Sequence, residues 1–210
     1  MNLKVSLTLP IIQLARISLS RDTTLNKLKK IFFDRFKDLK VDFIGWPSLL
    51  CVTLIALDQI TKVMTIQATP YSPRLIKEII PGFFNLVHYR NKGAAWGIGS
   101  SHTNILAIVS FVAFFVILFE FPKLCEKRKI NFLAISMMLG GIMGNGIDRA
   151  FRPAGVVDMI EVFIPYVIKE GWYRFPAFNI ADSAICVSVF IYIIASLRAP
   201  KTKTDEQKAD

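Results

Sequence analysis

Two aspartates in largely apolar surroundings give the strongest chemical signal in the sequence. Asp158 stands in the run 155–163, which is otherwise almost wholly apolar, and Asp182 stands near the start of the last apolar stretch. Two carboxyl groups that meet in a partly dry site cannot both ionise easily, so they share one proton and one pKa rises. Such a pair combines a base that takes a proton from water with an acid that hydrogen-bonds a scissile carbonyl. The chemistry indicated is hydrolysis of a peptide bond.

Each aspartate also has to be weighed against a structural role. Asp182 could be a carboxylate at a helix N-terminus, which is favourable by itself, and Asn179, one helical turn earlier, could orient it. Asp158 has no comparable explanation. His88 and His102 are the only histidines, and no cysteine lies in an expected outer loop, so a Ser–His or Cys–His nucleophile does not compete. The three cysteines show no metal-binding spacing. We therefore expect no metal and no cofactor.

A lysine and an aspartate stand close together in the first apolar stretch. Asp58 and Lys62 are four positions apart, so on a helix they share one face near its outer end. Charged groups at membrane depth are costly and often mark function. We favour the simpler interpretation here, a local ion pair that closes the helix end, over a direct part in catalysis.

A second polar segment, 91–97, precedes the second apolar stretch and contains Asn91, Gly93 and Ala94. Small residues let backbones approach closely, and an asparagine can donate and accept hydrogen bonds at once. The segment is equally compatible with a wall that binds an extended peptide backbone and with a tight turn against a helix.

The end of the third apolar stretch combines glycines with polar residues. Gly140 and Gly144 have the spacing of close helix–helix contacts. Asn145, Asp148 and Arg149 follow at positions that share a helix face. A buried structural network is the favoured interpretation for Asp148.

Four long apolar stretches must position these residues. A membrane-spanning helix needs roughly 20 residues, and these runs are too continuous for the alternating strands of a membrane barrel. We expect four transmembrane helices near Phe43–Met64, Thr103–Phe121, Ile130–Ile147 and Phe178–Leu197. The loop 65–102 has a strand-like composition, and the aromatic-rich loop 148–177 is expected to lie along the outer interface.

The charge distribution predicts the orientation of these helices. Of the 26 Lys and Arg residues, nine lie in residues 1–42, four between the second and third stretches and four in the C-terminal tail. Positive charge concentrates on the cytoplasmic side, so both termini are expected there and the loops 65–102 and 148–177 outside. The net charge of +10 thus indicates membrane sidedness rather than a nucleic-acid partner.

Five motifs in order resemble the lipoprotein signal peptidases (signal peptidase II). Each is weak alone, but their order on four spans of the expected sidedness is specific. They are Asp58-x-x-x-Lys62, Asn91-x-Gly93-Ala94-Ala95, Gly144-Asn145-x-x-Asp148-Arg149, Val157-Asp158-x-Ile160 and Phe178-Asn179-x-Ala181-Asp182.

The resemblance, which covers about residues 44–197, implies an all-α membrane protein: a four-transmembrane-helix bundle with a small extracytoplasmic β-cradle and an interfacial helix. It implies cleavage before a diacylglyceryl-modified cysteine in prolipoproteins, by Asp158 and Asp182. It makes the other motif residues supporting or substrate-binding, namely Asp58, Lys62, Asn91, Gly93, Ala94, Asn145, Asp148, Arg149, Asn179 and Ala181. It places the protein in the bacterial inner membrane as a monomer among membrane lipid, with no nucleic acid as partner.

The expected organisation has three parts. Residues 1–42 form a basic cytoplasmic extension that either lies on the membrane or is a poorly ordered leader, residues 43–198 form the peptidase domain, and residues 199–210 form a basic tail. The family often has Asp where Glu161 stands, and it usually begins close to its first span, so the resemblance does not cover residues 1–42.

Two other functions fit the polar residues less well. A small ion-coupled transporter places its ionisable groups near the midplane, whereas here they gather at one membrane surface. A non-enzymatic assembly factor would use the Asp–Arg pairs as structural contacts.

Overall fold

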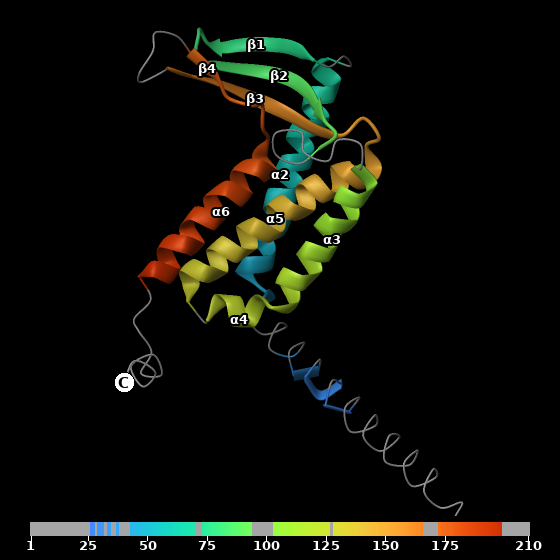
Figure 1. Ribbon diagram of the computed structural model, residues 1–210, viewed down its shortest axis with the longest axis vertical. Coiled ribbons are helices and arrows are strands. Elements are labelled where there is room, and N and C mark those ends of the chain that lie inside the picture. The colour runs from blue at the N-terminus through green and yellow to red at the C-terminus, as the bar shows by residue number, and fades with distance from the viewer. Residues whose placement is uncertain are drawn as a thin grey trace, which may run out of the picture.

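Four long helices and one antiparallel sheet make up the computed structural model (Figure 1). It describes residues 26, 27, 29–31, 33, 34, 37, 43–69, 73–93, 103–126, 128–165 and 172–198. The helices are α2 (Trp46–Ala68), α3 (Thr103–Phe119), the short α4 (Phe121–Cys125), α5 (Lys129–Phe151) and α6 (Ile180–Leu197), and the strands are β1 (Arg74–Ile80), β2 (Phe84–Asn91), β3 (Val156–Pro165) and β4 (Trp172–Arg174).

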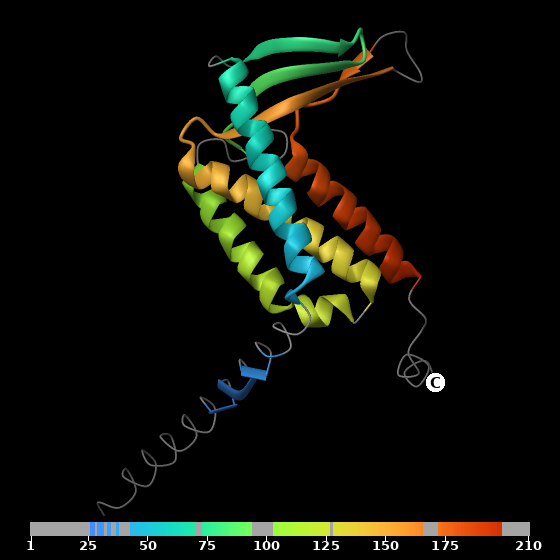
Figure 2. The same ribbon diagram turned by 180° about the vertical axis from the view of Figure 1, so that it is seen from behind.

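The helix α5 is the centre of the bundle. It packs against α2, α3 and α6; α3 and α6 flank it in Figure 1, and α2 crosses its other side in Figure 2. Its glycines permit this approach: a Cβ at Gly140 would lie 3.0 Å from Leu54 Cβ, and one at Gly144 would lie 2.7 Å from the carboxylate of Asp58. The close helix contacts expected from these glycines are therefore present.

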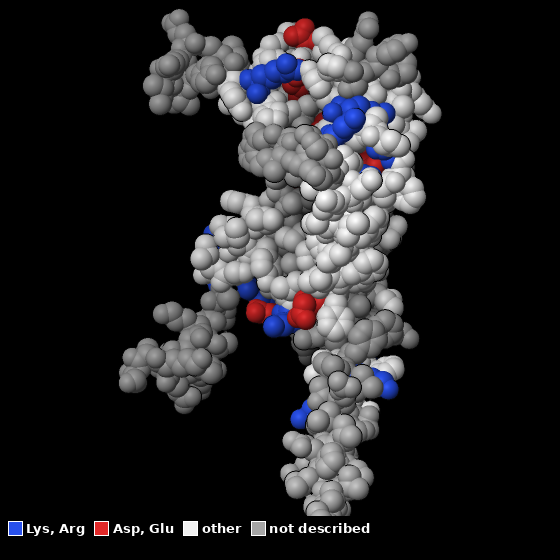
Figure 3. Space-filling view, turned by 45° about the vertical axis from the view of Figure 1, so that its right-hand side comes forward, with Lys and Arg blue, Asp and Glu red and all other residues white. Residues whose placement is uncertain are grey.

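Three helices, α2, α5 and α6, are long and apolar enough to cross a membrane, and α3 is an apolar helix of 17 residues. The outward faces of the bundle expose large apolar side chains such as Val52, Ile60, Phe115 and Phe190. Charged side chains gather at the two ends of the molecule and leave an uncharged band between them (Figure 3). This is the surface of a membrane protein, with the four helices where the sequence predicts them.

The sheet lies at the end of the bundle where α2 and α5 end and where α3 and α6 begin (Figure 1). Its strand order is β1-β2-β3-β4, all antiparallel, and Tyr89 is paired with Asp158. Met159 N and Ile160 N both donate to Phe178 O, which holds β3 against the chain that enters α6. At the edge of β2, the ring Nδ1 of His88 lies 2.7 Å from Thr69 O.

The sheet agrees with the small β-cradle that the resemblance implies, but it means that the fold is not all-α. The loop 148–177 is not only interfacial chain, because it supplies β3 and β4. Their partner is β2, from a distant part of the sequence, and pairing over such a separation leaves no local pattern to detect. Residues 94–102 and 166–171, in the two outer loops, lie outside the described residues, and the described ones contain no interfacial helix at the sheet end.

An apolar core lies at the end of the bundle opposite the sheet. It contains Cys51, Phe121, Cys125, Ile135 and Leu139. At this end α4 forms part of the short basic connection between α3 and α5. Residues 1–25 and 199–210 lie outside the described residues, and the positions described between 26 and 37 are helical and exposed.

Candidate active site

The two predicted catalytic aspartates reach one cavity from different elements. Asp158, only 3% exposed, comes from β3, and Asp182 comes from the first turn of α6. Both line a cavity of ≈ 1220 Å³ between the sheet and helices α3, α5 and α6. The sequence separation of the two residues is bridged by the pairing of β3 with Phe178, because that contact sets the strand over the start of α6.

Two asparagine side chains link the aspartates. Asn179 Nδ2 donates to Asp158 Oδ1 at 2.7 Å and to Asn145 Oδ1 at 3.1 Å. Asn145 Nδ2 donates to Asp182 Oδ1, also at 2.7 Å. Asn179 is in addition the N-cap of α6: its Oδ1 accepts from Asp182 N, while Asp182 Oδ2 accepts from Asn179 N. The orientation of Asp182 by Asn179 expected from their spacing is present.

The surroundings of Asp158 favour its protonated form. Burial raises the pKa of Asp158 most, and the negative charge of Asp182 raises it further, while the hydrogen bond from Asn179 and the charge of Lys62 lower it. The resulting pKa is about 7. A carboxyl group of this kind can carry a proton near neutral pH while its partner is ionised.

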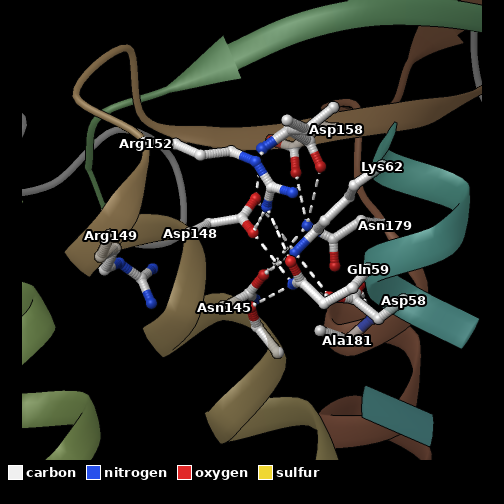
Figure 4. A network of polar contacts seen from close by, with 12 residues as sticks. Asp58, Gln59, Lys62, Asn145, Asp148, Arg149, Arg152, Asp158, Asn179 and Ala181 are labelled. Atoms are coloured by element: carbon white, nitrogen blue, oxygen red, sulfur yellow. Dashed lines mark hydrogen bonds and ion pairs between the residues drawn. The ribbon is translucent and has the colours of Figure 1, made fainter. Parts of the chain in front are cut away.

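A buried ion cluster lies beside Asp158 and the two asparagines (Figure 4). Lys62 Nζ is 2.8 Å from Asp58 Oδ2 and 3.3 Å from Asp148 Oδ2, and all three side chains are almost completely buried. Lys62 Nζ also donates to Asn145 Oδ1 at 2.9 Å. The predicted local pair of Asp58 and Lys62 therefore exists, but it is one part of a network that joins α2 to α5.

The same cluster holds the backbone next to each aspartate of the pair. Asp58 Oδ1 accepts from Ala181 N at 3.0 Å, and Asp148 Oδ2 accepts from Val157 N at 3.0 Å. Ala181 directly precedes Asp182, and Val157 directly precedes Asp158. Charged acceptors make strong hydrogen bonds in a dry environment. One buried lysine thus connects two carboxylates, each of which fixes one of the segments that present the pair.

Two network members were missed from the sequence. Gln59 Nε2 lies 3.0 Å from Asp148 Oδ1, and Arg152 pairs with Asp148 and donates to Gln59 Oε1 at 2.9 Å. Arg152 stands four residues after Asp148, so the spacing rule that identified Asp58 and Lys62 could have found it. Gln59 had no signal, because neighbouring residues on a helix do not share a face.

Arg149, grouped with Asn145 and Asp148 from the sequence, turns away from the network (Figure 4). Its guanidinium donates to Ser110 Oγ at 3.3 Å and to Gly93 O at 3.4 Å, and the residue lines the cavity from the α3 side.

The segment that begins at Asn91 forms a turn beside the cavity. Asn91 lines the cavity, where its side chain lowers the pKa of Asp158, and Asn91 Oδ1 accepts from Gly93 N at 2.9 Å. Gly155, with φ +100°, packs against this turn, where a Cβ would lie 2.5 Å from Asn91 O. A tight turn and a place in the cavity wall are thus both present. Ala94 lies outside the described residues.

The helix end of the cavity is mainly apolar, whereas its sheet end combines charged and polar side chains with apolar ones such as Phe175 and Phe178. Its helix end is lined by Val109, Ala113, Ile142, Ile185 and Cys186, and its sheet end by Tyr89, Arg90, Lys92, Glu161 and Arg174. The aspartate pair lies between these two parts. Such a site suits a molecule with an apolar portion and a peptide portion.

The family model for signal peptidase (SPase) II matches residues 50–198. The chain belongs to the signal peptidase II family. A lipoprotein signal peptidase of Staphylococcus aureus is 36% identical over 165 residues, which cover 79% of this chain and 96% of the relative. Its counterpart in Staphylococcus aureus strain MRSA252 is 35% identical over the same length.

Solved structures agree with this membership. A bacterial membrane enzyme determined at 2.3 Å is 34% identical and superposes with a TM-score of 0.63, covering 76% of this chain and 95% of that one. A second, at 1.9 Å, is 35% identical with the same TM-score and covers 75% of this chain and 96% of its own. Membership in the signal peptidase II family makes the chain an aspartic peptidase of the membrane, so the transporter and assembly-factor alternatives are set aside.

Proposed function

We propose that Asp158 and Asp182 are the catalytic pair of this signal peptidase and that its substrates are prolipoproteins with a diacylglyceryl-modified cysteine. The observation that carries the proposal is the placement of both carboxyl groups on one cavity, joined through the amides of Asn145 and Asn179. The raised pKa of Asp158 supports a division of roles, with Asp158 as the acid and Asp182 as the base.

The reaction then proceeds by direct attack of water. Asp182 takes a proton from the water while the water oxygen forms a bond to the scissile carbonyl carbon. At the same time Asp158 gives its proton to the carbonyl oxygen. The tetrahedral intermediate collapses when the hydroxyl proton returns to Asp158 and Asp182 protonates the leaving nitrogen. The C–N bond breaks, and the pair regains its single shared proton.

The apolar end of the cavity is suited to the acyl chains of the substrate. Val109 and Ala113 of α3 face it from one side, and Ile185 of α6 from the other. Each buried CH₂ contributes about 0.8 kcal/mol to such binding. That binding energy can orient the peptide bond just before the modified cysteine at the aspartate pair.

The same proposal includes the orientation and the assembly. The distribution of Lys and Arg supports a bacterial inner-membrane protein with both termini in the cytoplasm and the sheet at the outer face. The enzyme is proposed to act as a monomer, with both aspartates supplied by the same chain. The family match lies inside the expected peptidase domain, 43–198, and leaves the two basic terminal segments uncovered.

Lipid dependence of cleavage tests the proposed substrate. The purified protein is given the same precursor with and without the diacylglyceryl group, and product is followed by gel shift and mass. Efficient cleavage of the lipidated form alone, directly before the cysteine, is expected. Equal cleavage of both forms would indicate a general signal peptidase instead.

A further inference from the structure

Basic side chains surround the sheet end of the active-site cavity. Arg90 lies in β2, Lys92 directly follows that strand, and Arg174 lies in β4, and all three line the cavity. We call these three residues the cationic rim. Outside the catalytic pair, the described sheet residues that line the cavity include one carboxylate, that of Glu161.

The charge of Glu161 is already compensated. Glu161 is buried, its Oε1 lies 2.5 Å from the guanidinium of Arg174, and its Oε2 accepts from Asn85 Nδ2 at 3.1 Å. Arg174 also hydrogen-bonds the hydroxyl of Tyr89 and keeps 54% of its side chain exposed. With Glu161 counted against it, the rim keeps an excess of two positive charges.

Neither of the other rim residues has an ion-pair partner within the described part of the chain. The guanidinium of Arg90 donates to Gly155 O at 3.5 Å, and the side chain of Lys92 is exposed. Charges at the mouth of a cleft attract groups of opposite sign and influence which partner binds. The sheet end of the cavity is therefore suited to an anionic segment.

The polarity of the cavity gives the direction in which a substrate lies across it. On the proposed function, the acyl chains and the signal peptide occupy the membrane side, where the cavity is apolar. The chain that follows the modified cysteine must then leave past the sheet, because the catalytic pair lies between the apolar and cationic parts. That exiting segment passes Arg90, Lys92 and Arg174.

We propose that the cationic rim favours prolipoproteins with aspartate or glutamate in the first residues after the lipid-modified cysteine. The inference rests on the proposed function, since it assigns the rim to the substrate segment beyond the scissile bond. A peptide is preferred over a phospholipid headgroup as the partner, because the rim belongs to the cavity that holds the catalytic pair, where a resident lipid would block the substrate.

Two lipidated precursors that differ only in the two residues after the cysteine, Asp-Asp in one and Lys-Lys in the other, provide the test. Kinetics are measured with the full-length enzyme in zwitterionic nanodiscs. The acidic substrate should have the lower KM, by about two- to fivefold per exposed charge, with little change in kcat. The difference should shrink as salt is raised, because exposed charges are screened.

Matched lysine variants locate the effect. Lys92→Gln should reduce the KM difference between the two substrates, whereas Lys77→Gln should leave it as in wild type. Lys77 is an exposed lysine of the same sheet, on β1, that does not line the cavity. Arg174→Gln is a second rim variant, with its melting temperature measured because it also frees Glu161.

Several results would overturn the inference. Equal KM values for the two substrates would do so, as would a difference that Lys92→Gln and Lys77→Gln change to the same extent. A third contradicting result would come from nanodiscs that contain phosphatidylglycerol. If this anionic lipid shifted KM equally for both substrates, and Lys92→Gln removed that shift but not the KM difference between the substrates, the rim would bind lipid headgroups rather than the peptide. If wild type cut neither lipidated substrate, the proposed function would fail; if it cut both alike, only this inference would.

Discussion

Gly141→Ala is expected to damage catalysis by moving the start of α6. A Cβ at position 141 would lie 2.5 Å from the backbone oxygen of Ala181 and 2.7 Å from Ile185 Cγ1. A side-chain atom could rotate away, but a helix backbone oxygen cannot. Ordinary van der Waals contact begins at 3.4 Å, so α5 and α6 must separate by about 0.9 Å to reach it.

That separation is large on the scale of the catalytic geometry. The bond from Asn145 Nδ2 to Asp182 Oδ1 is 2.7 Å long, and a 0.9 Å shift along it would give 3.6 Å, which is no longer a hydrogen bond. Misplacement by about 1 Å can lower a rate about 100-fold. Overpacking costs about 1–3 kcal/mol of stability. We therefore expect kcat to fall by about 10- to 100-fold and the melting temperature to be modestly reduced.

The assay is steady-state cleavage of a lipidated precursor, with thermal unfolding in detergent measured in parallel. Gly146→Ala is the matched control on the same helix, because a Cβ there meets only Ser110 Cβ, at 3.2 Å. It should stay close to wild type. A Gly141→Ala enzyme that folds and keeps its wild-type kcat would refute the claim that the α5–α6 contact sets the position of Asp182.

Three further outcomes follow from the described contacts. Because the pKa of Asp158 is raised to about 7, the proton of the proposed acid is present below that pH and lost above it, so kcat/KM should fall as pH rises past 7; a flat profile to pH 9 would contradict this. Lys62→Met leaves buried Asp58 without its cation and Asp148 with Arg152 alone, and it should cost about 3–5 kcal/mol of unfolding free energy. Lys77→Met, on the exposed surface, should cost less than about 0.5 kcal/mol; equal melting temperatures of the two variants would contradict this. Cys186 is the exposed cysteine and lines the cavity. A bulky maleimide attached to it should therefore block cleavage in wild type but not in Cys186→Ser. Unchanged activity of the fully labelled wild-type enzyme would contradict this.

The sequence was sufficient for the features that depend on local periodicity. The four apolar helices, the Asp58–Lys62 pair and the close approach at Gly140 and Gly144 all follow from spacing along a single helix. The helix ends shifted by a few residues, for example from Met64 to Ala68 in the first span. Polar residues at helix ends read as loop in a hydropathy scan, yet here they lie in the last helical turn.

Features that depend on distant contacts could not be predicted in the same way. The run around Asp158 lacks alternation because side chains on both faces of β3 are buried, Val157 and Met159 on one face and Val156 and Asp158 on the other. The prolines, glycines and aromatic residues of the loop 148–177 instead indicated chain along the interface. The bond from Asp58 to Ala181 spans 123 positions, so its role in holding α6 is visible only in the fold.

The two arginines that follow Asp148 show most clearly what could not be predicted from the sequence. Arg149 and Arg152 both follow Asp148, and the resemblance named only Arg149, as a supporting or substrate-binding residue. In the fold Arg152 pairs with the carboxylate, while Arg149 turns towards α3 and the cavity. The choice between them depends on which side of α5 faces the sheet, and that is decided by the packing of α2 and α6.

The most direct test of the central claim is cleavage of a diacylglyceryl-modified precursor by Asp158→Asn and Asp182→Asn, each a nearly isosteric change that removes one member of the pair. Both variants should insert into the membrane and unfold at temperatures near wild type, and neither should release detectable signal peptide under single-turnover conditions. Wild-type processing by either folded variant would show that these two carboxyl groups do not carry out the hydrolysis.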